Sequence, residues 1–107
     1  MEINQYEWVL VNFDLTIESE MKKTRPCIVI SPNEMNKYLQ TIVVAPLTSS
    51  SKSYPTRVEI KQPKTKGWVV LDQIRTVDRT RIIKKLGNLT TTEIEAVKTV
   101  IMETYVE

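Results

Sequence analysis

Three clusters of polar side chains stand where apolar runs begin or end, and their residue types suit chemistry on a phosphate. Residues 20–25 end in Arg25 directly before Pro26, residues 48–51 read Thr-Ser-Ser-Ser, and residues 72–75 read Asp-Gln-Ile-Arg. A guanidinium offers a planar fork of donors that matches a phosphate, and it keeps its charge at any physiological pH. With hydroxyls to orient the phosphate and a carboxylate near the proton, the set suits phosphodiester cleavage by an internal nucleophile, which RNA carries in its 2′-hydroxyl.

The chain contains no histidine, and this absence removes much common chemistry. Zinc sites of the usual kind and catalytic arrangements built on imidazole are excluded. We therefore expect no metal site and no cofactor, with catalysis left to carboxylates, hydroxyls, Arg or Lys. The single cysteine, Cys27, lies in an apolar run, which excludes an internal disulfide and favours a small buried hydrophobe over a nucleophile.

The net charge of +2 is spread unevenly along the 107 residues. Residues 52–85 carry ten Lys or Arg against three acids, residues 1–21 carry five acids and no base, and residues 86–107 carry one lysine against four glutamates. The middle of the chain is therefore the part expected to face a polyanion, the alternative being a solvated surface with scattered lysines. No apolar run is long enough to span a membrane and no signal peptide is recognisable, so we expect a cytoplasmic protein.

Apolar periodicity predicts short strands and two helices in one domain, residues 1–107. The strands are expected at residues 6–13, 27–30, 41–47, 56–60, 68–71 and 82–86. Arg57 and Glu59 in the fourth of these are expected in water. Because Pro26 pushes the preceding residue out of the helical region, Arg25 should be held extended at a strand mouth.

The helices are predicted from their start signals. Ser31 as cap, Pro32 in the first turn and Glu34 closing a capping box predict a short helix that ends near Gln40. A second helix starts at Thr90 or Thr91 and carries an apolar stripe of Ile94, Val97, Ile101 and Tyr105. Asp78 is expected to cap a single turn through Arg81.

These elements predict a mostly β fold with appended helices (α+β), a small and mostly antiparallel curled sheet or barrel. In such a fold the ends of several strands can converge at one rim, which would bring the three polar clusters together.

Several short motifs occur in the order seen in the MazF/PemK (Kid) toxins, over nearly the whole chain. They are Thr24-Arg25-Pro26, Ser31-Pro32-x-x-Met35-Asn36, Val44-Ala45-Pro46-Leu47-Thr48-Ser49, Tyr54-Pro55-Thr56 and Leu71-Asp72-Gln73-Ile74-Arg75-Thr76-Val77-Asp78. The resemblance implies a toxin of a type II toxin-antitoxin system: a homodimeric, metal-independent endoribonuclease that cleaves single-stranded RNA and is neutralised by a cognate antitoxin. It also implies a small barrel like that of Src-homology-3 domains, with a C-terminal helix.

By the same resemblance, Arg25 and Thr48 match the positions regarded as catalytic in MazF-like members. Asp72 matches a proposed catalytic carboxylate of Kid-like members, but the arginine that acts with it there falls at Val70 here. RNA-binding positions are expected at Glu20, Lys22, Ser49, Gln73 and Arg75. The general base stays open between Asp72 and Glu20, each of which could equally be a structural acceptor.

The first loop departs from the family pattern, because Leu15 replaces a proline and Glu18 replaces a glycine. Reduced activity, an altered sequence preference and a substitution that limits toxicity are all open. Two other functions also remain open: a gyrase-binding toxin like CcdB, whose Trp-Gly-Ile ending this chain lacks, and a barrel that binds nucleic acid without cleaving it. Trp8 and Trp68 are interpreted as core or dimer-interface anchors, and Tyr38 as the better base-stacking candidate.

Overall fold

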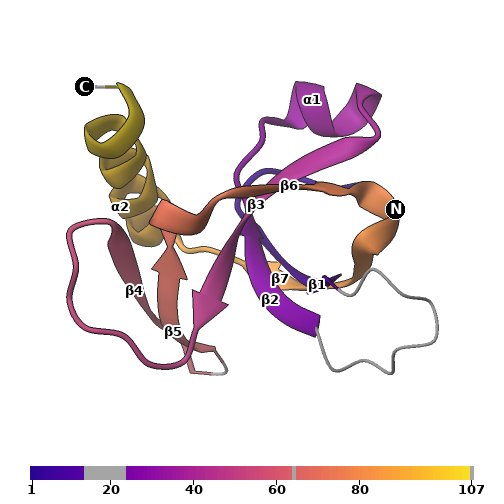
Figure 1. Cartoon of the computed structure of the whole chain (residues 1–107). Helices are drawn as coiled ribbons and strands as arrows, with labels where there is room; N and C mark the ends of the chain where they lie inside the picture. The colour runs from indigo at the N-terminus through magenta and orange to yellow at the C-terminus, as the bar shows by residue number, and fades with distance from the viewer. Residues whose placement is uncertain (14–23, 64, 107) are drawn as a thin grey trace.

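The computed structural model describes residues 1–13, 24–63 and 65–106, which form an antiparallel sheet flanked by helices (Figure 1). The strands are β1 (Glu7–Asn12), β2 (Thr24–Val29), β3 (Thr41–Thr48), β4 (Arg57–Lys61), β5 (Lys66–Val70), β6 (Arg75–Asp78) and β7 (Ile82–Asn88). The helices are α1 (Asn33–Tyr38) and α2 (Thr91–Ile101), with single turns η1 (Leu71–Gln73), η2 (Arg79–Arg81) and η3 (Met102–Val106). Within these described residues no helix is long and apolar enough to cross a membrane.

The strands lie in the order β4-β5-β3-β2-β1-β7, and β6 pairs with the first half of β3. The predicted class, mostly antiparallel strands with appended helices, is confirmed. Over the part of the chain that the structure describes, the outer strands β4 and β7 do not pair with each other, so the sheet is open and does not close into a barrel.

Both faces of the sheet bury apolar side chains. Successive residues of each strand point to opposite sides, so each strand contributes to both faces. One face packs beneath α2, where Trp8, Ile28 and Leu47 of the sheet cluster with Leu71 of η1 and Val97 of the helix. The other face buries Val9, Val11, Cys27, Val29, Ile42, Val44, Val77 and Ile82. The curled sheet therefore buries a hydrophobic cluster on each side.

The stripe predicted on the last helix is confirmed. Thr90 and Glu93 form the capping box at the start of α2, with Thr90 Oγ1 accepting from Glu93 N at 3.2 Å. Val97 is fully buried, Ile94 and Ile101 pack around it, and the Tyr105 hydroxyl donates to Leu71 O at 2.6 Å. Figure 1 shows α2 standing beside the β4–β5 hairpin.

The predicted start of the first helix is wrong. Pro32 occupies the cap position of α1 and no side chain caps the helix, so neither Ser31 nor Glu34 forms a capping box. Ser31 is buried and its hydroxyl accepts from Val43 N at 3.0 Å and donates to Asn36 Oδ1 at 2.5 Å. A tertiary contact between α1 and β3 therefore takes the hydroxyl that sequence reasoning gave to the cap.

Candidate functional site

The end of β3 and the start of β2 bring Thr48 and Arg25 to the same edge of the sheet, meaning the margin where these inner strands end. Cys27 pairs with Pro46, so continuing this register by two residues puts Arg25 beside Thr48, while Trp68 on the other side pairs directly with Thr48. Alternation places Arg25, Thr48 and Trp68 on one face. In Figure 1 this edge is the lower one, where the arrowhead of β3 and the start of β2 lie.

Arg25 is exposed, and its guanidinium is tied to the end of the neighbouring strand. Its Nη2 donates to Leu47 O at 3.2 Å. The Thr48 hydroxyl donates to Ser50 O at 3.1 Å, across the turn by which the chain leaves β3. One cation and one hydroxyl thus lie at neighbouring strand ends, each hydrogen-bonded to a backbone oxygen at the end of β3.

Arg75 adds a second cation to this face. It pairs with Val44 in β3, and its guanidinium lies over the Phe13 ring at 4.5 Å. Burial raises the pKa of the Cys27 thiol to about 12, although Arg25 and Arg75 both act to lower it. Cys27 is therefore a protonated core residue, as expected, and the two arginines lie near enough to each other to influence the same buried atom.

Asp72 belongs to a different group of side chains. Its Oδ1 accepts from Thr56 Oγ1 at 2.9 Å and from Arg57 Nε at 3.3 Å. Partial desolvation works to raise the pKa of Asp72, but the hydrogen bonds from Arg57 and Thr56 outweigh it and hold that pKa below its usual value. Asp72 lies in η1, just past the end of β5, and Arg57 joins it to Ser51 of the 48–51 cluster, because the same guanidinium donates to both side chains.

Arg57 is the functional candidate that sequence reasoning missed. It was expected in water, yet its side chain is only 19% exposed; besides Asp72 it contacts Ser51, to whose Oγ its Nη1 donates at 2.7 Å, and the Tyr54 ring at 4.9 Å. It also pairs across the strands with Val70, the position where the resemblance leads one to look for an arginine. The alternation of residues 56–60 placed Arg57 on the correct face, but only the register of β4 against β5 reveals its partner.

The remaining predicted residues lie in different parts of the molecule. Ser49 follows Thr48 and lines a cavity with Lys66, and Gln73 is exposed in η1. Tyr38 precedes β3 whereas Thr48 ends it, so the two are separated by the length of that strand. The predictions for Glu20 and Lys22, and the departures at Leu15 and Glu18, lie outside the described residues.

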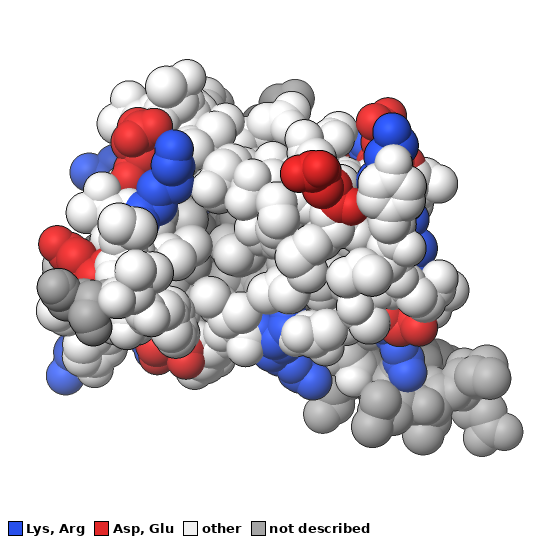
Figure 2. Space-filling model, turned by 90° about the horizontal axis from the view of Figure 1, so that it is seen from above, with Lys and Arg blue, Asp and Glu red and all other residues white. Residues whose placement is uncertain are grey.

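Charge on the opposite end of the molecule is sparse. Figure 2 looks onto the end that carries α1, where Lys and Arg stand in small separate groups between acids and uncharged side chains. Among the described residues that this view shows, Lys and Arg form no continuous basic surface.

Comparison with solved structures places this arrangement in a known fold. MazF from Deinococcus radiodurans superposes with a TM-score of 0.83, at 24% sequence identity, over 100% of this chain and 99% of that one. An endoribonuclease from a mycobacterial species, solved in complex with its cognate antitoxin, gives a TM-score of 0.82 at 19% identity, over 94% and 92% of the two chains.

Sequence comparison identifies the family. A curated relative, Endoribonuclease MazF from Staphylococcus saprophyticus, is 35% identical over 89 residues, which cover 78% of this chain and 74% of that protein. The family model of PemK-like, MazF-like toxins of type II toxin-antitoxin systems matches residues 4–105. With Arg25 and Thr48 at one sheet edge in the fold of solved MazF proteins, the chain belongs to the PemK-like, MazF-like toxin family.

Proposed function

We propose that this toxin is an endoribonuclease that cuts single-stranded RNA without a metal, with Arg25 and Thr48 at the scissile phosphate. The observation that carries the proposal is the placement of a fixed guanidinium beside a hydroxyl on one exposed strand edge. The activity named for the curated relative, and family membership over nearly the whole chain, support it.

The reaction uses the RNA's own nucleophile. The 2′-oxygen forms a bond to phosphorus, the bond from phosphorus to the 5′-oxygen breaks, the 2′-proton leaves to a base, and the 5′-oxygen takes up a proton. The products are a 2′,3′-cyclic phosphate and a 5′-hydroxyl. Arg25 keeps its proton at physiological pH and has no acceptor, so it cannot serve as the base. It stabilises the charge that develops on the phosphorane, donates the proton that the departing 5′-oxygen takes up, and regains a proton from water. Thr48 holds a non-bridging oxygen or the 2′-hydroxyl.

Asp72 is assigned a positioning role in this proposal. A carboxylate that already accepts from Arg57 and Thr56, and whose pKa is lowered by those bonds, is a weak acceptor for the 2′-proton. It fixes Arg57, and Arg57 in turn holds Ser51 in the loop that follows Thr48. Glu20 then remains the predicted base, with Lys22, Ser49, Gln73 and Arg75 as predicted contacts to the RNA.

The biological setting follows from the family. We assign the toxin a cytoplasmic site of action, where cleavage of mRNA would inhibit translation and growth, and a homodimeric assembly. A cognate antitoxin is its partner, as in the solved MazE-MazF complex of Deinococcus radiodurans. An acidic C-terminal segment of that antitoxin would complement the cations at the Arg25 edge.

The test is incubation of the purified protein with a long RNA in EDTA, followed by mapping of the cut ends. Cuts at one short motif, with cyclic-phosphate and 5′-hydroxyl ends, are expected, and a single 2′-deoxy substitution at the cut site should block them. Intact RNA together with inhibition of gyrase would replace the proposal with a protein-binding toxin.

A further inference from the structure

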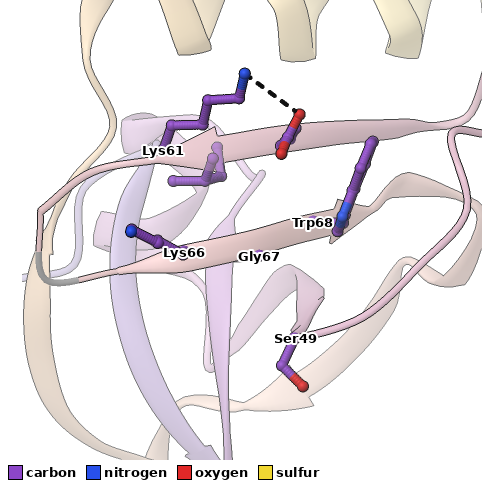
Figure 3. A pocket seen from close by; sticks show the side chains of 7 residues that line it. Ser49, Lys61, Lys66, Gly67 and Trp68 are labelled. Atoms are coloured by element: carbon purple, nitrogen blue, oxygen red, sulfur yellow. Dashed lines mark ion pairs between the residues drawn. The ribbon is translucent and has the colours of Figure 1, made fainter.

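A cavity of about 470 Å³ lies beside Thr48, on the β4–β5 hairpin and the loop after β3. Its lining comprises Ser49, Glu59, Ile60, Lys61, Lys66, Gly67 and Trp68 (Figure 3). The volume is in the range of ligand pockets. The lining joins one large aromatic to three charged side chains and is more polar than a usual small-molecule site, which suits a charged strand that carries aromatic bases. We propose that this cavity binds one nucleobase of the RNA strand, stacked on Trp68, next to the phosphate that is cut.

Trp68 is placed for stacking and is not a core residue. It pairs with Thr48 on one side and with Glu59 on the other, so it belongs to the same face as Arg25. It is partly exposed, whereas Trp8 is 1% exposed and packs in the hydrophobic cluster beneath α2. An accessible indole within reach of a phosphate site is a sequence-tolerant platform for bases. Trp68 is therefore not a core anchor within this chain, and of the two roles expected for it only that of a dimer-interface anchor stays open.

The charges around Trp68 orient the strand. Lys61 and Lys66 pair across the hairpin, and in Figure 3 they lie on the side of the cavity away from Trp68. Lys61 Nζ stands 3.7 Å from Glu59 Oε1, an exposed pair that contributes little to stability and is free to exchange partners. Glu59, beside Trp68, repels a phosphate but accepts from an exocyclic amino group. The RNA backbone is thus drawn toward Lys66, and the base toward Trp68 and Glu59. Because uracil has no exocyclic amino group to donate to Glu59, this arrangement disfavours uracil.

The same charges favour RNA over an acidic peptide as the occupant. A peptide carboxylate near Trp68 would meet Glu59, whereas a neutral base would not. This inference rests on the proposed function, because it places the base relative to a phosphate held by Arg25 and Thr48.

The experiment uses a 2′-O-methyl oligonucleotide, which has no nucleophile and cannot be cut. Its affinity for the full chain is measured by anisotropy of a label on the oligonucleotide, and stacking by quenching of tryptophan fluorescence. We expect quenching in the wild type and none in Trp68→Phe, which retains only the buried Trp8. Trp68→Ala should bind about tenfold more weakly, in line with the loss of one stacked base, while Trp68→Phe stays within about threefold of wild type.

Matched variants test separately how the lysine and the glutamate of the cavity affect binding. Lys66→Ala should weaken binding and reduce its salt dependence, whereas Lys98→Ala, which removes an exposed lysine of α2, should change neither. Oligo-uridine should bind more weakly than oligo-cytidine, and Glu59→Gln should narrow that difference.

Several results would overturn the proposal. The first is an unchanged affinity of Trp68→Ala for the oligonucleotide. The second is weaker binding by Trp68→Ala that appears only together with loss of self-association in sedimentation, because Trp68 would then be an interface anchor. Failure of the wild type to bind the oligonucleotide while it binds an acidic peptide would assign the cavity to a peptide. Cleavage of unmodified RNA is assayed in parallel. Binding and quenching without cleavage would contradict the proposed nuclease activity and support the base pocket. Cleavage by Trp68→Ala with full affinity for the oligonucleotide would contradict only the base pocket.

Discussion

At the scale of single residues, Arg25 carries the electrostatic part of the proposed reaction. Replacing it with Ala should lower the rate of RNA cleavage by about 100-fold or more, because its guanidinium is the cation that the strand register puts beside Thr48. Arg25→Lys keeps the charge but loses the planar fork of donors, so its cleavage rate should lie between those of the wild type and Arg25→Ala. The measurement is the initial rate of cleavage in EDTA, with thermal melting to verify the fold. A folded Arg25→Ala protein with near-normal cleavage would remove Arg25 from the site.

Asp72 and Arg57 are expected to act as one unit. Arg57→Ala should lower cleavage by about tenfold through the loop that holds Ser51, and Asp72→Asn by a similar factor. Because each change disables the same contact, the double variant should be no worse than either single one. Rates of the two single variants and the double variant form the cycle. Additive losses would show that the two residues act independently. An Asp72→Asn effect as large as that of Arg25→Ala would instead make Asp72 the base.

The two pairs of residues differ in how far they could be predicted. Arg25 and Thr48 each sit inside a local motif, so their types and places were readable from the chain alone. Arg57 and Asp72 are 15 positions apart and meet only because β4 and β5 pair with Arg57 opposite Val70. Register across a hairpin depends on turn geometry and packing, which one sequence does not specify.

At the scale of elements, Gly67 determines how closely β5 can approach the end of β3. Its φ is +155°, and a Cβ placed there would lie 2.6 Å from the backbone oxygen of Thr48. Gly67→Ala must therefore push the two strands apart at Thr48. We expect loss of stability and a fall in cleavage at temperatures where the variant is still folded.

Gly87 supplies the matched control. Its φ is +156°, nearly the same, but a Cβ there meets only Trp8 Cδ1 at 3.9 Å. Gly87→Ala shares the backbone strain without the clash, so it should lose some stability and retain cleavage when folded. Urea unfolding and initial rates compare the two. Equal cleavage in both folded variants would mean that the approach of β5 to Thr48 is unimportant.

Local signals predicted elements well where the residues act locally. The capping box of α2 and the Asp78 cap of η2, in which Thr80 N donates to Asp78 at 2.9 Å, need only residues near in sequence. β6 was missed because residues 75–78 look like the end of a loop, and only pairing with Thr41–Val44 makes them a strand. Burial of Ser31 against Asn36 likewise overrode a good local cap signal.

At the scale of the whole molecule, the sheet buries residues on both faces and leaves its polar chemistry at the edge. The cluster beneath α2 and the cluster around Cys27 each take alternate residues of the same strands. Strand ends lie beyond both clusters, so Arg25 and Thr48 stay accessible while the strands behind them are held rigid. A site on strand ends is more precisely placed than one on loops alone.

Acid should destabilise the fold partly through two carboxylates. Hydrogen bonds from Thr80 and Gln40 lower the pKa of Asp78, and those from Arg57 and Thr56 outweigh desolvation to lower the pKa of Asp72. A carboxyl whose pKa is lower when folded stabilises the protein above its unfolded pKa, about 3.9, and that contribution is lost as pH falls through the folded value. Asp72→Asn and Asp78→Asn should therefore be less stable than wild type near neutral pH.

The pH dependence distinguishes this effect from a simple packing loss. Urea midpoints of each variant and of the wild type should converge as the pH is lowered below about 3, because the wild-type carboxyls are then also uncharged. Since both groups are exposed, the differences at neutral pH should be small. A deficit of the same size at pH 7 and at low pH would contradict the charge argument, and it would show that the asparagine amide fails to replace the carboxylate as an acceptor for Arg57 or Thr80.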